Sequence, residues 1–106
     1  MMTGMTQRLE DYTTLVTELN AEYWTDRGYT HAPAPVATVS LGKRYAKVVV
    51  DNSVHSFVDM DNGDIIKGTW KAPIRTPGKG LAVRGNIFAD DLGKSKITCD
   101  APRYLI

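Results

Sequence analysis

The stretch SVHSFVDMDNGDIIKGTWKAP, residues 53–73, carries the strongest fold signal in the chain. Two runs rich in β-branched and aromatic residues, 54–60 and 64–70, flank the dipeptide Asn62-Gly63. Asn-Gly between such runs is typical of a two-residue hairpin turn, because both central residues of that turn adopt positive φ. The stretch therefore predicts an antiparallel β-hairpin.

The residues before this hairpin continue the two-residue period of a β-strand. Runs 36–41 and 44–50 are separated by Gly42-Lys43, and Asn52-Ser53 separates the second run from the hairpin. These turns predict a four-stranded antiparallel meander over residues 36–70. The register that follows places Val48 opposite Phe57, and Phe57 over Gly68, where the missing side chain leaves room for a ring.

This register assigns the strand residues to two faces of the sheet. The face expected to form the core carries Ala37, Val39, Leu41, Ala46, Val48, Val50, His55, Phe57, Ile66 and Trp70. The reverse face carries Thr38, Ser40, Tyr45, Lys47, Val49, Ser56, Val58, Met60, Ile65, Lys67, Thr69 and Lys71. A three-residue turn at 51–53 would invert the parity, because a one-residue slip moves every side chain to the other face.

Residues 6–24 predict one amphipathic helix. Its apolar stripe has spacings of three and four residues and consists of Leu9, Tyr12, Val16, Leu19 and Tyr23. Thr6 is a suitable N-cap, and Gly28 followed by Pro33 and Pro35 predicts the end of the helix and an extended connector. We expect the helix to cover the core face of the sheet.

The remainder completes a single α+β domain over residues 1–106, a length typical of one domain. Residues 71–84 contain Pro73, Pro77, Gly78 and Gly80 and predict a long basic loop. Residues 85–106 predict a C-terminal segment that docks on the domain through its apolar residues.

Charge is unevenly distributed although the net charge is only +1. Residues 1–34 carry two basic and five acidic side chains, and residues 35–84 carry eight basic and four acidic ones. The predicted helix is therefore acidic and the sheet region basic. A single cysteine, Cys99, excludes an internal disulfide, and with no apolar stretch of spanning length and no signal segment we expect no membrane association.

Catalytic and metal-binding patterns are missing from the sequence. It lacks a G-x-S-x-G, an H-E-x-x-H, a dinucleotide fingerprint and a phosphate loop, and its two histidines and one cysteine are too few for a typical zinc site. We expect a non-enzymatic protein without metal or cofactor. The remaining enzymatic alternative is a cleft in which His55, Asp59 and Arg84 converge, whereas the simpler interpretation of His55 is a packed strand residue.

The reverse face and the loop after it supply the candidates for macromolecule binding. They are Tyr45, Lys47, Lys67, Lys71, Arg75, Lys79, Arg84 and Asn86. The cations could neutralise phosphates and Tyr45 could stack on an unpaired base, as in a nucleic-acid-binding surface. Val49, Val58, Met60 and Ile65 on the same face instead favour cover by a protein partner or a second copy.

Part of the chain is similar to proteins of a known origin. The matching segments are SVHSFVD (53–59), NGDI (62–65), Lys67, WKAP (70–73) and RGNI (84–87). In this combination the chain resembles a family of small uncharacterised proteins encoded by tailed bacteriophages, with a longer segment between Pro73 and Arg84. The resemblance implies expression in the cytoplasm of an infected bacterium, and it implies no activity or site.

Together these observations predict a non-enzymatic phage accessory protein that binds a host or phage macromolecule, for instance as an inhibitor. A protein is the favoured partner. Nucleic-acid binding through the basic sheet face and the 71–84 loop is one alternative, and a self-associating structural protein is another.

Overall fold

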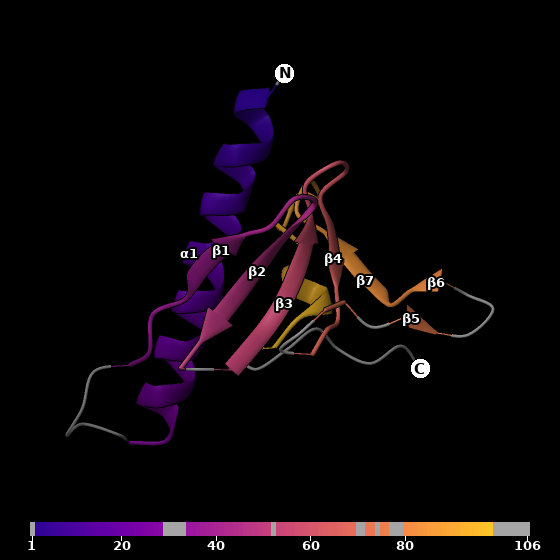
Figure 1. Ribbon diagram of the computed structural model, residues 1–106. Helices are drawn as coiled ribbons and strands as arrows, with labels where there is room; N and C mark the ends of the chain where they lie inside the picture. Colours follow the sequence, from indigo (N-terminus) through magenta and orange to yellow (C-terminus); the bar gives the residue numbers. More distant parts are fainter. Residues whose placement is uncertain are drawn as a thin grey trace.

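The fold consists of one long helix and an antiparallel sheet (Figure 1). The structure, a computed structural model, describes residues 2–28, 34–51, 53–69, 72–73, 75–76 and 80–98. Helix α1 spans Met2–Asp26, and the sheet contains β1 (Thr38–Leu41), β2 (Tyr45–Val50), β3 (Ser53–Asp59), β4 (Asp64–Ile66) and β7 (Val83–Asn86) in the order β1-β2-β3-β4-β7. Strands β5 (Arg75–Thr76) and β6 (Gly80–Leu81) form a separate pair, and the 3-10 helix η1 spans Lys94–Lys96.

The predicted α+β class is confirmed, but the sheet has five strands and not four. The fifth strand, β7, begins inside the predicted loop 71–84 and ends inside the predicted C-terminal segment, and that loop also contains β5 and β6. The sequence did not indicate β7 because its four residues, VRGN, include a glycine and show no apolar alternation. Helix α1 also extends beyond the predicted residues 6–24 at both ends.

At two of the three predicted turns the strand pairing is shifted by two residues, which keeps the faces unchanged. Val39 pairs with Val48 and not with Ala46, so the β1–β2 connection is longer than Gly42-Lys43. Val58 pairs with Ile65, so Asn62-Gly63 is the second half of a four-residue β3–β4 connection. The carbonyl of Asp59 accepts hydrogen bonds from the backbone N–H groups of Asn62 and Gly63, at 3.3 and 2.7 Å. Gly63 has a φ of 84°, the region that favours glycine.

An irregularity between β2 and β3 overturns the predicted faces of β3 and β4. At the β2–β3 turn Val50 pairs with Ser53, whereas the predicted turn at Asn52-Ser53 would pair it with His55. This shift of two residues alone would leave the predicted faces of the strands unchanged. The register then shifts between Val48 and Val49, so that Val48 pairs with Ser56 and Val49 pairs with Val54, which makes His55 the extra residue of β3. Such a β-bulge exchanges the two faces of the strand that follows it.

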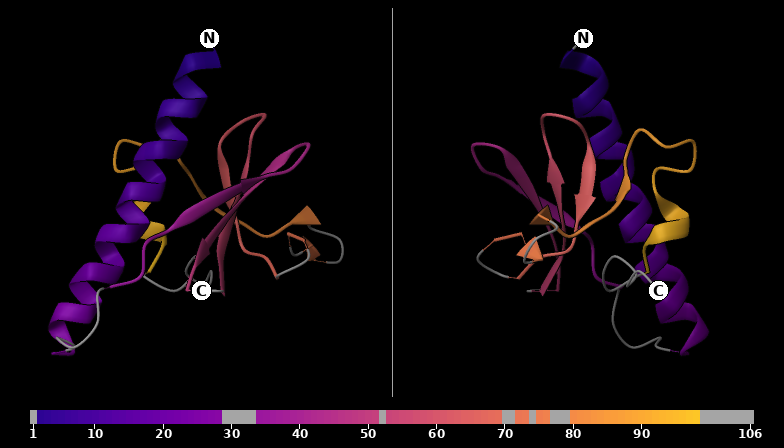
Figure 2. Two further views of the ribbon diagram at one scale, coloured as in Figure 1. Left: turned by 60° about the vertical axis from the view of Figure 1, so that its left-hand side comes forward. Right: turned by 90° about the vertical axis from the view of Figure 1, so that its right-hand side faces the viewer.

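The corrected faces explain the core. Val58 and Ile65, predicted for the reverse face, are fully buried in the cluster that contains the α1 residues, and Met60 packs against it. Phe57 and Ile66 are buried outside that cluster, on what we call the open face, the face of the sheet that α1 does not cover. In Figure 2, α1 and the segment that contains η1 lie on one side of the sheet, and the β5–β6 pair lies away from them.

The core combines the predicted helix stripe with residues that the sequence did not indicate. Its members are Leu9, Tyr12, Leu15, Val16, Ala37, Ala46, Val48, Val50, Val58, Ile65, Ile87 and Ile97. Tyr23, predicted for the stripe, is 38% exposed because α1 extends beyond the sheet there. Arg8 joins α1 to the segment after β7, because Nε and Nη2 donate hydrogen bonds to the carbonyls of Ile87 and Ala89 at 2.7 and 2.6 Å.

One predicted contact of the open face is confirmed. A Cβ atom at Gly68 would collide with the ring of Phe57, so the ring does lie over the glycine. Phe57 pairs with Ile66, and the ring therefore reaches Gly68 diagonally, two residues further along the neighbouring chain. The predicted core residue Trp70 lies outside the described residues.

The bulge brings two polar side chains into contact with α1. His55 and Ser56 are buried, and the Tyr12 hydroxyl lies 2.7 Å from Ser56 Oγ, which lies 2.8 Å from His55 Nδ1. His55 Nε2 is 2.8 Å from the carbonyl oxygen of Thr98, which can only accept, so Nε2 carries the proton. In the neutral ring Nδ1 then accepts from Ser56, and Ser56 accepts from Tyr12. Burial raises the pKa of Tyr12 far above its usual value, although the hydrogen bond to Ser56 lowers it.

We expect Tyr12→Phe to lower the free energy of unfolding by about 1–3 kcal/mol, because it removes the donor from which the buried Ser56 Oγ accepts a hydrogen bond. Urea denaturation of the two proteins measures this difference. The matched control is Tyr23→Phe, at an exposed position of the same helix, where we expect a change within about 0.5 kcal/mol. Equal effects of both substitutions would contradict the role given to the Tyr12 hydroxyl.

Candidate functional site

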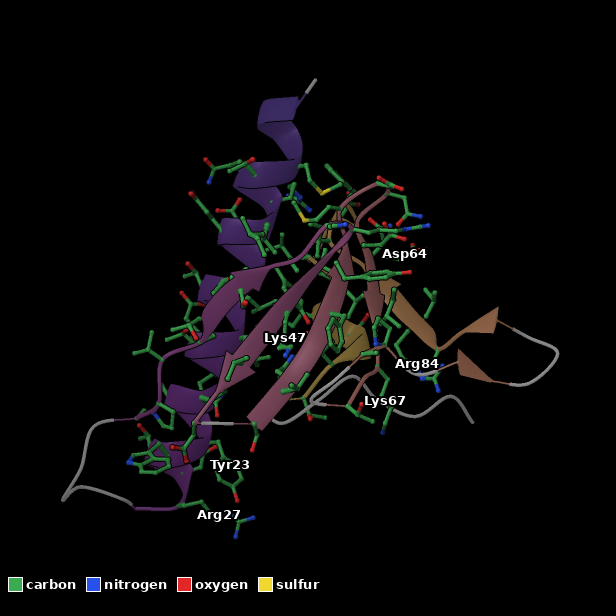
Figure 3. The ribbon with its side chains drawn as sticks, in the orientation of Figure 1. Tyr23, Arg27, Lys47, Asp64, Lys67 and Arg84 are labelled. Atoms are coloured by element: carbon green, nitrogen blue, oxygen red, sulfur yellow. The ribbon has the colours of Figure 1, made fainter. Side chains whose placement is uncertain are left out.

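Of the predicted binding residues that the structure describes, Tyr45 and Lys47 share one face of the sheet, whereas Lys67 and Arg84 lie elsewhere. Tyr45 and Lys47 lie on the open face of β2, where they alternate with the buried residues of that strand. Lys67 comes two residues after Ile65, which belongs to the helix-side core, so the register does not place Lys67 on the same face as Lys47. Figure 3 shows Lys47 over the middle of the sheet and both Lys67 and Arg84 toward its β4–β7 side. The described part of the chain does not include Lys71, Lys79 or the side chain of Arg75.

Asn86 stabilises a turn. Its Nδ2 donates to the carbonyl of Asn62 and to Oδ1 of Asp64, both at 3.0 Å, and its Oδ1 accepts from the backbone N–H of Phe88 at 2.7 Å. These bonds connect the β3–β4 turn to the chain that leaves β7. The amide group of Asn86 therefore holds the turn in place and does not contribute to a binding surface.

Arg84 occupies a second bulge. Ile65 pairs with Gly85 and Ile66 with Val83, which leaves Arg84 as the extra residue of β7. Its Nε is buried and has no hydrogen-bond partner within the described part of the chain, and its Nη1 reaches only the carbonyl of Val83, at 3.3 Å. Leaving a buried donor unsatisfied costs about 1–3 kcal/mol, more when it is charged.

A hollow on the open face combines cations with aromatic rings. It has a volume of about 520 Å³ and lies beside the β1–β2 connection. We call it the basic aromatic hollow, and its charged and aromatic lining consists of Lys43, Arg44, Tyr45, Lys47 and Phe57. The rings of Tyr45 and Phe57 meet edge to face, with centroids 6.5 Å apart and an angle of 84°. Ala72 and Pro73 close another side.

Asp59 fixes the position of one of these cations. Its buried carboxylate binds Arg44, with Oδ2 3.0 Å from Nη2. Its Oδ1 accepts from the backbone N–H of Asp61 at 2.9 Å. Burial raises the pKa of Asp59, but the hydrogen bonds from Arg44 and Asp61 and the charge of Arg44 outweigh it, so the pKa lies below its usual value.

A larger groove lies between α1 and β1. It has a volume of about 660 Å³, and we call it the α1–β1 groove. Its lining consists of Thr6, Leu9, Glu10, Thr13, Thr14 and Thr17 of α1 and Val36, Ala37, Val39 and Leu41 of the β1 region. Val36 and Leu41 are 65% and 70% exposed. The sequence assigned Val39 and Leu41 to the core and so missed the groove, because the pattern of an edge strand resembles that of a covered one.

The structure does not bring His55 and Asp59 together in a cleft. His55 is hydrogen-bonded inside the core, and Asp59 follows four residues later in the same extended strand, roughly 13 Å away at 3.3 Å per residue. Within the described residues no group of three or more His, Cys, Asp and Glu side chains could hold a metal ion. No described helix is long and apolar enough to span a membrane.

The fold and these two hollows define a small α+β domain with an uncovered edge strand and a basic, aromatic sheet face. A family model described as "Family of unknown function (DUF7717)" matches residues 2–101, so the chain belongs to this family. No curated protein and no solved structure matches the chain.

The Asp59 ion pair predicts a pH dependence of stability. Because folding lowers the pKa of Asp59, its stabilising contribution is present above the unfolded value of about 3.9 and is lost as the pH falls through the folded pKa. We expect Asp59→Asn to lower the free energy of unfolding at pH 7 and to reduce its decrease on acidification. Urea titrations across the acidic range measure both effects.

The control for this prediction is Asp51→Asn, at an exposed position at the end of β2. It should preserve the acid-induced loss of stability. A variant at Asp59 that loses stability with falling pH as steeply as the native protein would contradict the prediction.

Proposed function

We propose that the protein is a non-enzymatic phage accessory protein that acts in the host cytoplasm by binding an extended segment of a host or phage protein, thereby inhibiting it. The observation that supports this proposal most is the exposed edge of β1 beside the α1–β1 groove. An extended peptide can add to such an edge by backbone hydrogen bonds, while adjacent pockets select its alternate side chains.

Strand β1 lacks the usual protection of an edge. Its outer side faces no other strand of the five-stranded sheet, and its sequence, TVSL, contains no charge and no proline. Its pairing with β2 is regular over all four residues. Natural edge strands are usually blocked by charges, prolines or bulges, because an open edge recruits other strands. The opposite edge, β7, has the bulge at Arg84.

The groove offers apolar contacts to one side of an added strand. In Figure 1, β1 crosses in front of α1, and the groove lies between these two elements. Side chains of an extended segment alternate between its faces, so every second residue would point toward α1. Leu9, Val36 and Leu41 would then pack against apolar side chains of the segment, which supports a partner with apolar residues at alternate positions.

Charge favours a basic segment over a second copy of the protein. Glu10 is the charged residue of the groove lining, and residues 1–34 carry five acidic and two basic side chains. A symmetric β1–β1 pair would place two copies of α1 on the same side of the combined sheet and bring like charges together. A separate chain with lysine or arginine among its apolar residues avoids this repulsion.

The test uses matched threonine variants of α1. Thr14 lines the groove, whereas Thr25 is exposed near the end of the same helix and does not. We expect nuclease-treated lysate of the infected host to yield a stoichiometric protein partner with the native chain and with Thr25→Lys. Thr14→Lys should weaken this binding at least tenfold, because its charge blocks the groove and repels a basic segment.

The purified partner then allows a direct measurement at β1. Hydrogen exchange should show new protection of β1 backbone amides in the complex and no equivalent change in β7. Equal binding of both threonine variants, or unchanged exchange at β1, would disprove the proposal. A dimer of the chain alone that dissociates with Thr14→Lys would instead identify the self-associating alternative.

A further inference from the structure

We propose that the basic aromatic hollow is a second binding site, which takes single-stranded nucleic acid, with one base stacked on Tyr45 and flanking phosphates bound by the cations around it. The hollow lies on the open face of the sheet, and the α1–β1 groove lies on the side of α1. The inference therefore goes beyond the proposed protein partner, and it rests on the charged and aromatic residues of the hollow, although Leu41 lines both sites.

The charges of the lining select an anion. Lys43, Arg44 and Lys47 line the hollow, and its lining contains no aspartate or glutamate. Arg44 is held by Asp59 through Nε and Nη2, which leaves Nη1 without a hydrogen bond within the described part of the chain. The Arg44 side chain is still 53% exposed, so its guanidinium can meet a phosphate without first breaking the ion pair.

The aromatic rings select a ligand with a flat apolar part. Phe57 is buried and forms the floor, fixed between Tyr45 and the space over Gly68. Tyr45 is half-buried and stands edge-on to this floor, while the Arg44 Cζ atom lies 5.5 Å from its ring centroid. A half-buried tyrosine between cations is the arrangement by which proteins stack an unpaired base while binding the adjacent phosphates.

The size of the hollow and the corrected register both support this ligand. A volume of about 520 Å³ lies within the range of roughly 300–1,000 Å³ typical of small-molecule sites, so one nucleoside unit fits. The bulge at His55 also moves Val58, Met60 and Ile65 to the helix side, where they pack in the core. Of the apolar residues that favoured a protein partner on this face, only Val49 therefore remains on it.

Fluorescence anisotropy with a short unstructured oligothymidylate tests the proposal. We expect binding at low salt, and binding about 5- to 150-fold weaker for a phosphodiester chain of equal length without bases, the cost of losing one stacked base. Tyr45→Leu should weaken the oligonucleotide to a similar extent. Tyr23→Leu is the matched control, because Arg27 lies 4.9 Å from that ring at the end of α1, away from the hollow.

The lysines have a matched control as well. Lys47→Gln should reduce the slope of log affinity against log salt by about 0.7, the value for one phosphate contact of a single strand. Lys94→Gln, at an exposed residue of η1, should leave the slope unchanged. In the native protein, NMR resonances of the Tyr45 and Phe57 rings should shift on titration with the oligonucleotide, a measurement that needs no substitution.

Several results would overturn the inference. They are the absence of binding at low salt, equal affinity for the base-free chain, equal effects of Tyr23→Leu and Tyr45→Leu, and unchanged ring resonances. Equal competition by an oligoglutamate peptide would identify an acidic protein segment as the ligand, and equal competition by thymidine monophosphate would identify a free nucleotide. None of these results depends on protein binding at the α1–β1 groove, so the two proposals can fail separately.

Discussion

The insertion of His55 into β3 is the constraint on which the rest of the structure depends. The extra residue places His55 and Ser56 together beneath α1, where a single line of hydrogen bonds runs from Tyr12 through both to the carbonyl of Thr98. These hydrogen bonds join the helix, the central strand and the chain after η1, and replacing them is costly because Tyr12, Ser56 and His55 are buried. The same insertion determines which side chains of β3 and β4 face α1.

The sequence predicts the regular parts of this fold and fails where a single residue is added. The spacing of Leu9, Tyr12, Val16 and Leu19 and the alternation in β2 follow from helical and strand periods, and the structure agrees with both. Nothing in the string SVHSFVD indicates that His55 is the extra residue of a bulge, since its alternation of side chains fits either register. The sequence did not indicate β7 for a different reason. Its residues, VRGN, show no apolar alternation, and the backbone hydrogen bonds that hold the strand leave no sign in the sequence.

The candidate binding surfaces were likewise predicted only in part from the sequence. Tyr45 and Lys47 were identified from the sequence because strand alternation alone places them together. Arg44 was missed, because its proximity to Asp59 depends on the connection between β1 and β2 and on the β2–β3 pairing. The α1–β1 groove was also beyond prediction, since it depends on how far the helix leaves the edge of the sheet uncovered. The two hollows differ in character as the sequence suggested, acidic beside the helix and basic on the sheet.

The hydrogen bonds of Arg8 to the carbonyls of Ile87 and Ala89 have a consequence for biosynthesis. The partners are about eighty positions apart in the sequence, so the helix is made first and its docking surface last. During translation these contacts of α1 cannot form until about eighty further residues have been made. Such long-range closure slows folding and prolongs exposure to chaperones and proteases. The yield of folded protein would therefore depend on the folding capacity of the cell that makes it.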